Sequence, residues 1–367
     1  MNRKSRLTGI DLFRAIAAYG VVVIHGLGTV PRDYFAEQVT RLFSNFSVPF
    51  FLVTAFYFMI NSLFPLKRNG YLKSRAIRLL FPYIIWSLIH ILARLFKSFI
   101  LKADSENFSK FIGDPINIIF FGSASVQLYF LPLLFSGTLA AIVITRYLKK
   151  ESPIGLLLIL FILSIITDRL LLDSGNSFQL GKGIAFESLA AEIWSSANMN
   201  SISRVVLVNF SWTIRCLPYI FAGIILNESS VKTAMQNYNN KQNRMYLMLF
   251  TIAIVCILLL NIPLIVDIAA IILPYTALIL GIVLSKEVEA NALLENIGYC
   301  SFGIYLIHDL IALGFAVVIT KVYPGIVGIQ LSAIALLLIA GVVFLVSWGA
   351  TFIISMNKKI STIFLGT

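Results

Sequence analysis

The sequence predicts an all-α fold, a polytopic membrane helix bundle with about ten transmembrane helices. Composition is the first reason: 59% of the 367 residues are hydrophobic and only 13% are charged, whereas soluble domains carry about 25% charged residues. The second reason is a mean hydropathy of +0.90. The third is that apolar stretches of about 20 residues, the length that spans the hydrocarbon core of a bilayer, recur along the whole chain.

The apolar runs place the spans in order. We expect them at residues 9–28, 43–62, 79–99, 126–147, 154–172, 205–226, 245–262, 264–285, 297–319 and 328–355. Asp11 and Arg14 interrupt the first run, which is long enough to cross a membrane, so we interpret it as a transmembrane helix and not as a signal peptide. Residues 261–263 form a tight turn between two spans, and residues 105–123 include a short interfacial helix. No loop is long enough for a second domain, so we expect residues 1–367 to form a single transmembrane domain.

Lysine and arginine predict the orientation, because the cytoplasmic loops of membrane proteins are enriched in them. Most of those near the spans lie on one side, which we assign to the cytoplasm together with both termini. They are Arg3, Lys4, Arg6, Lys67, Arg68, Lys73, Arg75, Arg78, Arg146, Lys149, Lys150, Lys232, Lys241, Arg244, Lys286, Lys358 and Lys359. The opposite loops contain only Arg32, Arg41, Lys102, Lys110, Lys182 and Lys321. The formal net charge of +12 therefore reflects topology, and no basic stripe interleaved with aromatic residues indicates nucleic-acid binding.

The first span carries Asp11, Arg14 and His25, although ionisable side chains cost about 2.5 to 3.5 kcal/mol at the centre of a membrane. At about 100° per residue, Arg14 and His25 share one face and lie about 16 Å apart along the helix. Asp11 lies one turn before Arg14 and is close enough to pair with it. A snorkelling arginine or a hydrogen-bonded interhelical histidine would explain either residue alone. Their alignment favours a functional site.

Two arginines mark the cytoplasmic start of the third span. Arg75 and Arg78 are three residues apart, which places their guanidinium groups on neighbouring parts of a helix. Paired guanidinium forks match the oxygens of a phosphate group. Arginines at this position are also what the topology rule and anionic lipids favour, so the pair alone leaves both interpretations open.

Later spans contain further polar candidates. Ser301, Tyr305 and His308 fall on one helical face, which could hydrogen-bond a hydroxylated substrate or hold neighbouring helices together. Arg215 lies in the middle of the sixth span and therefore needs a counter-charge or a wet cavity. No spacing of cysteine or histidine suggests a metal site.

Several motifs occur in a characteristic order. The first is residues 10–17 (IDLFRAIA) followed by His25, and the second is Arg75-x-x-Arg78. Three more are QLYFL at 127–131, LPYIFAG at 217–223 and SFGIYLIH at 301–308. Together they resemble the acyltransferase 3 family, multi-spanning acyltransferases that modify bacterial surface polysaccharides. The resemblance covers essentially the whole chain and is to the stand-alone type, without a fused extracytoplasmic domain.

The chain departs from the family pattern at two places. Residues 50–55 (FFLVTA) lack the Ser-Gly that commonly follows the paired phenylalanines, and Tyr129 stands where the family often has tryptophan. Neither position is the histidine or one of the arginines. The departures therefore bear on acceptor or acyl specificity more than on activity.

The resemblance implies a multi-pass protein of the bacterial cytoplasmic (inner) membrane that transfers an acyl group from cytoplasmic acyl-CoA. Acetyl-CoA is the expected donor, no metal is implied, and the acceptor is a sugar hydroxyl of a surface polysaccharide or lipid-linked glycan on the outer face. His25, Arg14 and Asp11 would be catalytic, and Arg14, Arg75 and Arg78 would bind the donor. The residues expected to bind substrate are Tyr129, Arg215, Ser301, Tyr305 and His308.

Two catalytic routes and two other functions stay open. His25 could act as a general base for the sugar hydroxyl, or it could be acylated itself and pass the group on. Charged residues inside ten helices are also typical of a secondary transporter or a flippase of an envelope glycan precursor, although no internal repeat is visible. The third function is that of a noncatalytic membrane partner in an envelope assembly.

Overall fold

A computed structural model describes residues 7–26, 30–63, 70–99, 115–148, 152–173, 201–237, 239–263, 265–289, 291–322 and 330–366. In these segments the secondary structure is helical, apart from an isolated bridge between Arg32 and Leu331. Ten helices are long and apolar enough to cross a membrane. The predicted fold class and the predicted number of spans are therefore confirmed.

Each predicted span coincides with a long helix. These helices are α1 (Thr8–His25), α2 (Tyr34–Leu63), α3 (Tyr71–Phe99), α6 (Phe130–Tyr147), α7 (Ile154–Asp173), α9 (Ser201–Asn227), α11 (Lys241–Leu260), α12 (Val266–Leu284), α13 (Ala292–Val322) and α14 (Ala333–Met356). The shorter ones are α5 (Pro115–Phe121), the 3₁₀ helix η1 (Val126–Tyr129), α10 (Ser229–Asn237) and α15 (Lys358–Leu365). The sequence did not predict α10 and α15.

Helix ends differ most from the prediction at α2 and α3, which begin at Tyr34 and Tyr71 instead of at residues 43 and 79. Hydropathy detects only the apolar part of a helix, whereas backbone hydrogen bonding continues through its polar turns. The Asp33 side chain accepts a hydrogen bond from the Ala36 N–H at 2.7 Å and so caps the start of α2.

Two predicted loop features have different outcomes. The turn between α11 and α12 is confirmed: Asn261 adopts a left-handed φ of 50° and its N–H bonds to the carbonyls of Ile257 and Leu258. Helix α5 lies within residues 105–123, where a short interfacial helix is expected; residues 105–114 lie outside the described residues. Most of residues 173–204, between the fifth and sixth predicted spans, also lie outside them. The sidedness of the termini stays a prediction.

The chain divides into two compact units. The first comprises Met1–Ala55 and Ser229–Lys358, and the second comprises Phe56–Glu228 and Lys359–Thr367. The chain passes from one unit to the other within α2, between α9 and α10, and at the start of α15. The expectation that residues 1–367 form a single domain stays a prediction.

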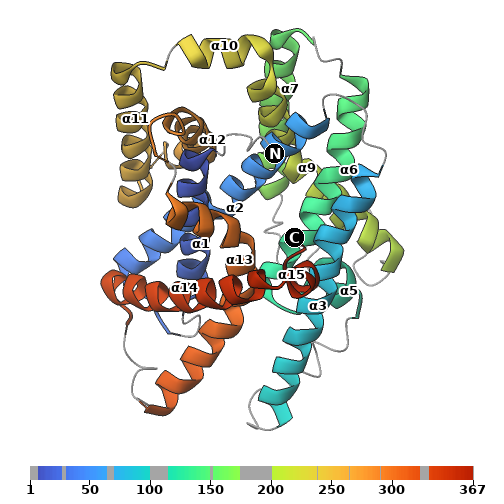
Figure 1. Ribbon diagram of the computed structural model, residues 1–367, viewed down its shortest axis with the longest axis vertical. Helices are drawn as coiled ribbons and strands as arrows, with labels where there is room; N and C mark the ends of the chain where they lie inside the picture. The colour runs from blue at the N-terminus through green and yellow to red at the C-terminus, as the bar shows by residue number, and fades with distance from the viewer. Residues whose placement is uncertain are drawn as a thin grey trace. The chain divides into compact units, whose positions relative to one another are not determined.

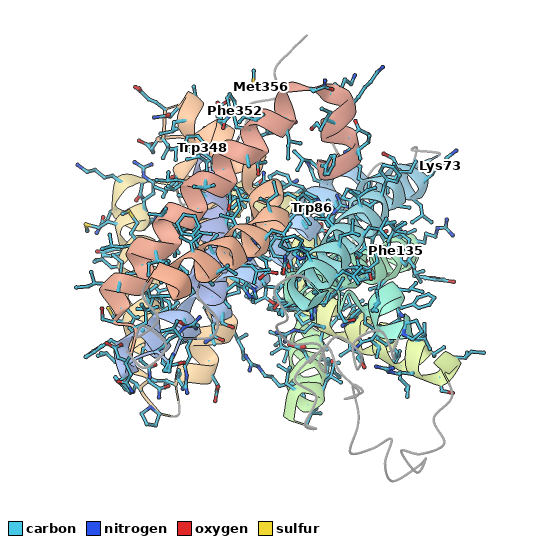
Figure 2. All side chains as sticks on the ribbon, turned by 90° about the horizontal axis from the view of Figure 1, so that it is seen from below. Lys73, Trp86, Phe135, Trp348, Phe352 and Met356 are labelled. Atoms are coloured by element: carbon cyan, nitrogen blue, oxygen red, sulfur yellow. The ribbon has the colours of Figure 1, made fainter. Side chains whose placement is uncertain are left out.

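In the first unit, α1 packs against α12, α13 and α14, and α11 packs against α12 (Figure 1). Small residues allow the closest approach: a Cβ on Gly281 of α12 would lie only 3.2 Å from the carbonyl oxygen of Gly9 in α1. Polar contacts add to this packing. The Tyr19 hydroxyl donates to the Leu337 carbonyl at 2.7 Å, and the Trp348 indole N–H donates to Asn296 Oδ1 at 2.8 Å. Figure 2 shows Trp348 on α14, followed along the helix by Phe352 and Met356.

In the second unit, α9 packs against α5, α6 and α7, and α3 packs against α6 and η1. Gly137 of α6 lies so close to α9 that a Cβ there would come within 2.8 Å of Cys216 Cβ. The indole N–H of Trp86, in the middle of α3, donates to the Phe364 carbonyl of α15 at 2.8 Å (Figure 2). These contacts set the positions of the helices that carry Arg75, Arg78, Tyr129 and Arg215.

Candidate active site

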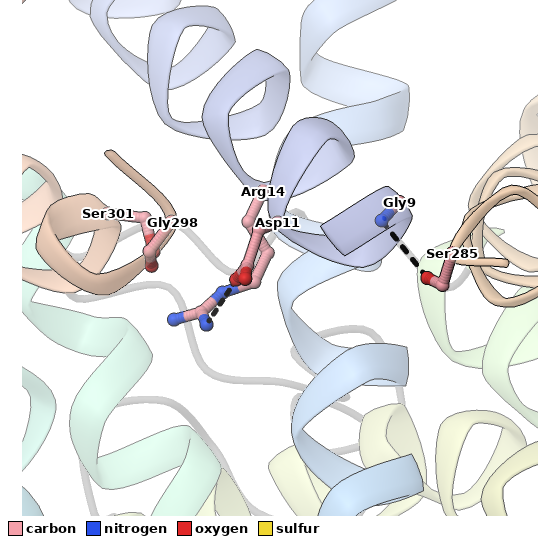
Figure 3. Close-up of polar contacts among 6 residues, drawn as sticks. All are labelled: Gly9, Asp11, Arg14, Ser285, Gly298 and Ser301. Carbon is pink, nitrogen blue, oxygen red and sulfur yellow. Dashed lines mark hydrogen bonds and ion pairs between the residues drawn. The ribbon is translucent and has the colours of Figure 1, made fainter. Parts of the chain in front are cut away.

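An ion pair lies near the beginning of α1 in the first unit. Arg14 Nη1 is 3.5 Å from Asp11 Oδ1, so the predicted pairing is confirmed (Figure 3). Asp11 is buried against α13 at Gly298, where a Cβ would lie 2.7 Å from Asp11 Cγ. Ser285, directly after α12, accepts a hydrogen bond through Oγ from the Gly9 N–H at 3.0 Å. These contacts hold the Asp11 carboxylate in place, while the Arg14 side chain keeps 27% of its surface exposed.

His25, the last residue of α1, lies beside a second histidine. The ring centroids of His25 and His308 of α13 are 5.2 Å apart. Among the residues that the structure describes, no hydrogen bond holds the half-buried His25 ring. The Asp309 carboxylate and the Arg32 guanidinium both act on it electrostatically. Within the described part of the chain, packing and charge therefore position the imidazole, and no hydrogen bond occupies its nitrogens.

His308 has a fixed tautomer. It is fully buried, and its Nδ1 lies 2.7 Å from the Tyr305 carbonyl oxygen and 3.2 Å from that of Ile304. Carbonyl oxygens only accept, so Nδ1 carries the proton, and the neutral ring keeps its lone pair on Nε2. The orientation of the neutral His308 ring, with a proton on Nδ1 and a lone pair on Nε2, is thus fixed by its own helix.

Arg32 closes the end of α1. Its Nη2 donates to the carbonyls of Ile24 at 2.8 Å and Gly26 at 3.4 Å, and its Nη1 donates to Thr40 Oγ1 at 2.9 Å. These bonds satisfy backbone acceptors that the last turn of a helix leaves open, and a cation there also suits the helix dipole. Burial lowers the pKa of Arg32, while the Glu37 carboxylate opposes this effect. Arg32 therefore holds the backbone on both sides of His25.

The three candidates on α13 have different surroundings. The Tyr305 side chain is 2% exposed and its ring lies 6.1 Å from His308 and 6.2 Å, edge to face, from Phe51 of α2. His308 is thus brought to His25, and Tyr305 contacts His308. Ser301 Oγ instead donates to the Gly298 carbonyl at 2.8 Å within its own helix.

Arg75 and Arg78 lie in the first turns of α3, in the second unit. Arg78 is exposed, and the half-buried Arg75 has a buried Nε that no group in the described part of the chain accepts from. The two positive charges repel each other. An anion held between them removes this repulsion and supplies the missing acceptor. The pair therefore has the donors and the charge that a phosphate group needs.

Tyr129 and Arg215 also meet in the second unit. Arg215 Nη1 donates to Asp168 Oδ2 of α7 at 2.6 Å, so the counter-charge that the sequence required is Asp168. The phenol groups of Tyr129 and Tyr219 both interact electrostatically with this guanidinium. A charged cluster therefore lies inside the second unit, among helices that the sequence predicts to be in the membrane.

Sequence reasoning missed Asp168, Gly298 and Arg32. Asp168 is followed by Arg169 inside a span, and the cost of burying two charges could have identified it. Gly298 is one of 22 glycines, and Arg32 is a single loop cation, so neither carries a distinguishing signal. Within the described segments, no group of three histidine, cysteine, aspartate or glutamate residues is placed to hold a metal ion.

Ten apolar helices and charged side chains held inside them define an integral membrane protein with a buried polar site. A family described as an acyltransferase domain matches residues 7–352. The chain belongs to this family, acyltransferase 3, and is a membrane acyltransferase. None of the curated proteins and none of the solved structures matches it significantly.

Proposed function

We propose that the protein transfers an acyl group, with acetyl the expected one, from cytoplasmic acyl-CoA to a sugar hydroxyl. The acceptor is a surface polysaccharide or a lipid-linked glycan at the outer face of a bacterial inner membrane. Family membership supports acyl transfer, and the side chains of the two units support the particular chemistry.

The observation that carries the proposal is the His25 imidazole, half-buried beside His308 with no hydrogen bond from the described residues. A histidine that serves only to join helices would be hydrogen-bonded across them. As a general base, His25 takes the proton of the acceptor hydroxyl while the hydroxyl oxygen attacks the thioester carbonyl carbon. The C–S bond breaks and coenzyme A leaves as the thiol with that proton. Such a base contributes about 10² to 10⁴ in rate.

The second route forms a covalent intermediate. An imidazole nitrogen attacks the thioester carbonyl carbon, the C–S bond breaks, and coenzyme A leaves as the thiol with the proton that the imidazole gives up. The acceptor hydroxyl oxygen then attacks the acyl carbon, the C–N bond to His25 breaks, and the hydroxyl proton returns to the imidazole. In either route, His308 contacts the His25 ring and the Asp309 carboxylate acts on it electrostatically. Both routes need His25, so they share the first test.

Donor binding is assigned to the three arginines. Arg75 and Arg78 would bind phosphate groups of acyl-CoA, because Arg75 Nε is a buried donor with no acceptor in the described part of the chain. In the first unit, Arg14 stays partly exposed while Asp11 pairs with it, and it is a separate candidate for binding a negatively charged group of the donor. Tyr305 and His308 are the candidates for the acceptor side in the first unit.

Release of coenzyme A from acetyl-CoA by the purified full-length chain, with a cell-envelope glycan fraction as acceptor, tests the proposal. We expect turnover in the wild type, loss of turnover by about 10² or more in His25→Ala, and little change in Tyr19→Phe. Tyr19 is the matched control because it lies on the same helix and bonds only through its hydroxyl to Leu337. Wild-type turnover in His25→Ala would refute the catalytic assignment, and transport of a glycan precursor without thioester cleavage would favour the flippase.

Sidedness is tested separately in sealed vesicles of known orientation. Acetyl-CoA should support transfer only from the cytoplasmic side, and the acyl group should appear on glycan at the other side. Equal activity with both substrates confined to the cytoplasmic compartment would refute transfer across the membrane even if His25 is essential.

A further inference from the structure

The second unit contains a group of charged and phenolic side chains outside the residues assigned to catalysis. We call it the α7–α9 cluster; its members are Asp168, Arg169, Arg215, Tyr219 and Tyr129. The Tyr219 phenol interacts electrostatically with Arg215, Asp168 and Arg169. Tyr129, at the end of η1, interacts with Arg215. The phenol of Tyr219 therefore lies near the three charged members of the cluster.

The Asp168 carboxylate is only half satisfied. Its Oδ2 accepts from Arg215 Nη1 at 2.6 Å, whereas its Oδ1 is buried and accepts from no group in the described residues. The residue as a whole is 7% exposed. Leaving a buried carboxylate oxygen without a donor costs free energy, and such exceptions in native structures need a reason, such as a ligand or a bound water.

Arg169, the next residue on α7, has a buried donor that lacks an acceptor, whereas Asp168 has a buried acceptor that lacks a donor. Its Nε is a buried donor that finds no acceptor among the described side chains and carbonyls. The cluster thus offers one unfilled acceptor and one unfilled donor. A hydroxyl group is both donor and acceptor, so neighbouring hydroxyl groups of one ligand can satisfy both.

A purely structural ion pair does not explain this arrangement. A pair that serves only to join α7 and α9 gains most when every polar atom is satisfied, because unpaired buried charge offsets the attraction. The Arg215 side chain also keeps 22% of its surface exposed, and Tyr129 is half-buried, so two members of the cluster keep surface that a ligand can contact. Two phenol rings add flat surfaces of the kind that pack against a sugar ring.

We propose that the α7–α9 cluster binds neighbouring hydroxyl groups of a sugar ring and so selects the carbohydrate acceptor. In this arrangement Asp168 Oδ1 accepts from one hydroxyl and Arg169 Nε donates to another, while Arg215 holds the Asp168 carboxylate in position. The inference rests on the proposed function for the identity of the ligand as acceptor. It adds Asp168, Arg169 and Tyr219 to the residues that contact it.

Binding of simple neutral sugars to the full chain in lipid nanodiscs tests the inference. The probes are the methyl glycosides of glucose, galactose, mannose, rhamnose and N-acetylglucosamine, titrated without acyl donor and followed by calorimetry. We expect at least one to bind saturably to the wild type, and Asp168→Asn to weaken that binding by about tenfold or more. The amide would place an N–H where the ligand hydroxyl needs an acceptor, and a hydrogen bond to a charged group is worth about 1.5 to 3 kcal/mol, or about 10- to 100-fold.

Glu287→Gln is the matched control. It removes one carboxylate from another ion pair, that of Arg244 Nη1 and Glu287 Oε1 at 3.0 Å in the first unit, and should leave glycoside binding unchanged. Absence of glycoside binding in the wild type, or affinity within twofold of wild type in Asp168→Asn, would overturn the inference.

A charge swap separates binding from helix joining. In the double variant Asp168→Arg/Arg215→Asp, a purely structural pair would restore both thermal stability and glycoside affinity. If the cluster binds sugar, we expect the double variant to regain thermal stability but not glycoside affinity. Restored glycoside affinity would overturn the inference. If the double variant does not fold, the glycoside affinity of Asp168→Asn tests the inference instead. Acetyl-CoA affinity and coenzyme A release to water are measured in parallel. Their presence without glycoside binding would refute the acceptor site alone, and their absence in the wild type would refute the proposed function alone.

Discussion

One methyl group at Gly298 should disturb the proposed active site. A Cβ at this position would lie 2.7 Å from both Cβ and Cγ of Asp11, whereas carbon atoms pack best at about 3.5 to 4.0 Å. In Gly298→Ala, α1 and α13 must therefore separate locally by about 1 Å. That movement shifts the Asp11 carboxylate and, through their ion pair, Arg14.

The expected loss of activity exceeds the expected loss of stability. Overpacking costs about 1 to 3 kcal/mol, and alanine regains about 0.5 to 1 kcal/mol because it is a better helix former than glycine. The net loss in the free energy of unfolding is thus at most about 2.5 kcal/mol. Misplacing a catalytic group by about 1 Å can cost about 10² in rate. We expect acyl transfer to fall by about 10- to 100-fold in protein that still inserts and folds.

The assay is acetyl-CoA turnover by purified variants, with the thermal midpoint as the measure of folding. Gly314→Ala is the matched control, since it lies on the same helix and a Cβ there meets nothing within 4 Å; it should be as active as the wild type. In an Asp11→Ala background, Gly298→Ala should add little, because the two changes act through one contact. Turnover of Gly298→Ala within twofold of wild type, or full additivity with Asp11→Ala, would show that this contact does not position the site.

Three further outcomes follow from contacts already described. Arg75→Ala and Arg78→Ala should each weaken acetyl-CoA affinity by about tenfold in direct titration. Lys73 is exposed on the same turns of α3, and Lys73→Ala should leave the affinity unchanged. Equal losses of affinity in all three variants would show that the arginines serve only to set the topology. Arg32→Met should lower turnover by about tenfold with unchanged donor affinity, because two carbonyls at the end of α1 lose a charged donor; unchanged turnover would contradict this positioning role. Asn261→Ala should lower the free energy of unfolding by about 1 kcal/mol in thermal unfolding, because a φ of 50° is unfavourable for alanine. Asn261→Gly should not lower it. An equal effect of both substitutions would exclude the backbone conformation as the cause.

Physical constraints explain why the spans could be predicted. In lipid every backbone polar group must be satisfied within the segment, so an apolar run of sufficient length has to be a helix. The Asp11–Arg14 pair was predictable for a similar reason, because residues three apart on a helix are neighbours. Such local rules need no knowledge of the rest of the fold.

Contacts between distant helices could not be predicted in this way. His25 and His308 are on separate helices, and no spacing rule connects them. Their approach depends on side chains that let α1 pack closely, as at Gly9 and Gly281, where hydropathy gives no signal because glycine is common in membrane helices. The Asp168–Arg215 pair is intermediate: the need for a counter-charge followed from the sequence, but the choice of partner required the packing of α7 on α9.

The discontinuous first unit imposes an order on biosynthesis. The Gly9–Ser285 hydrogen bond joins residues 276 positions apart in the chain. At about 5 to 20 residues per second, α1 is synthesised about 14 to 55 s before its partners on α12 and α13. During that interval the membrane-insertion machinery has to accept a helix carrying Asp11, Arg14 and His25 with only the Asp11–Arg14 pair available to offset their cost. The Asp11–Arg14 pair therefore also stabilises the nascent chain, because the two opposite charges partly neutralise each other before α12 and α13 have been synthesised.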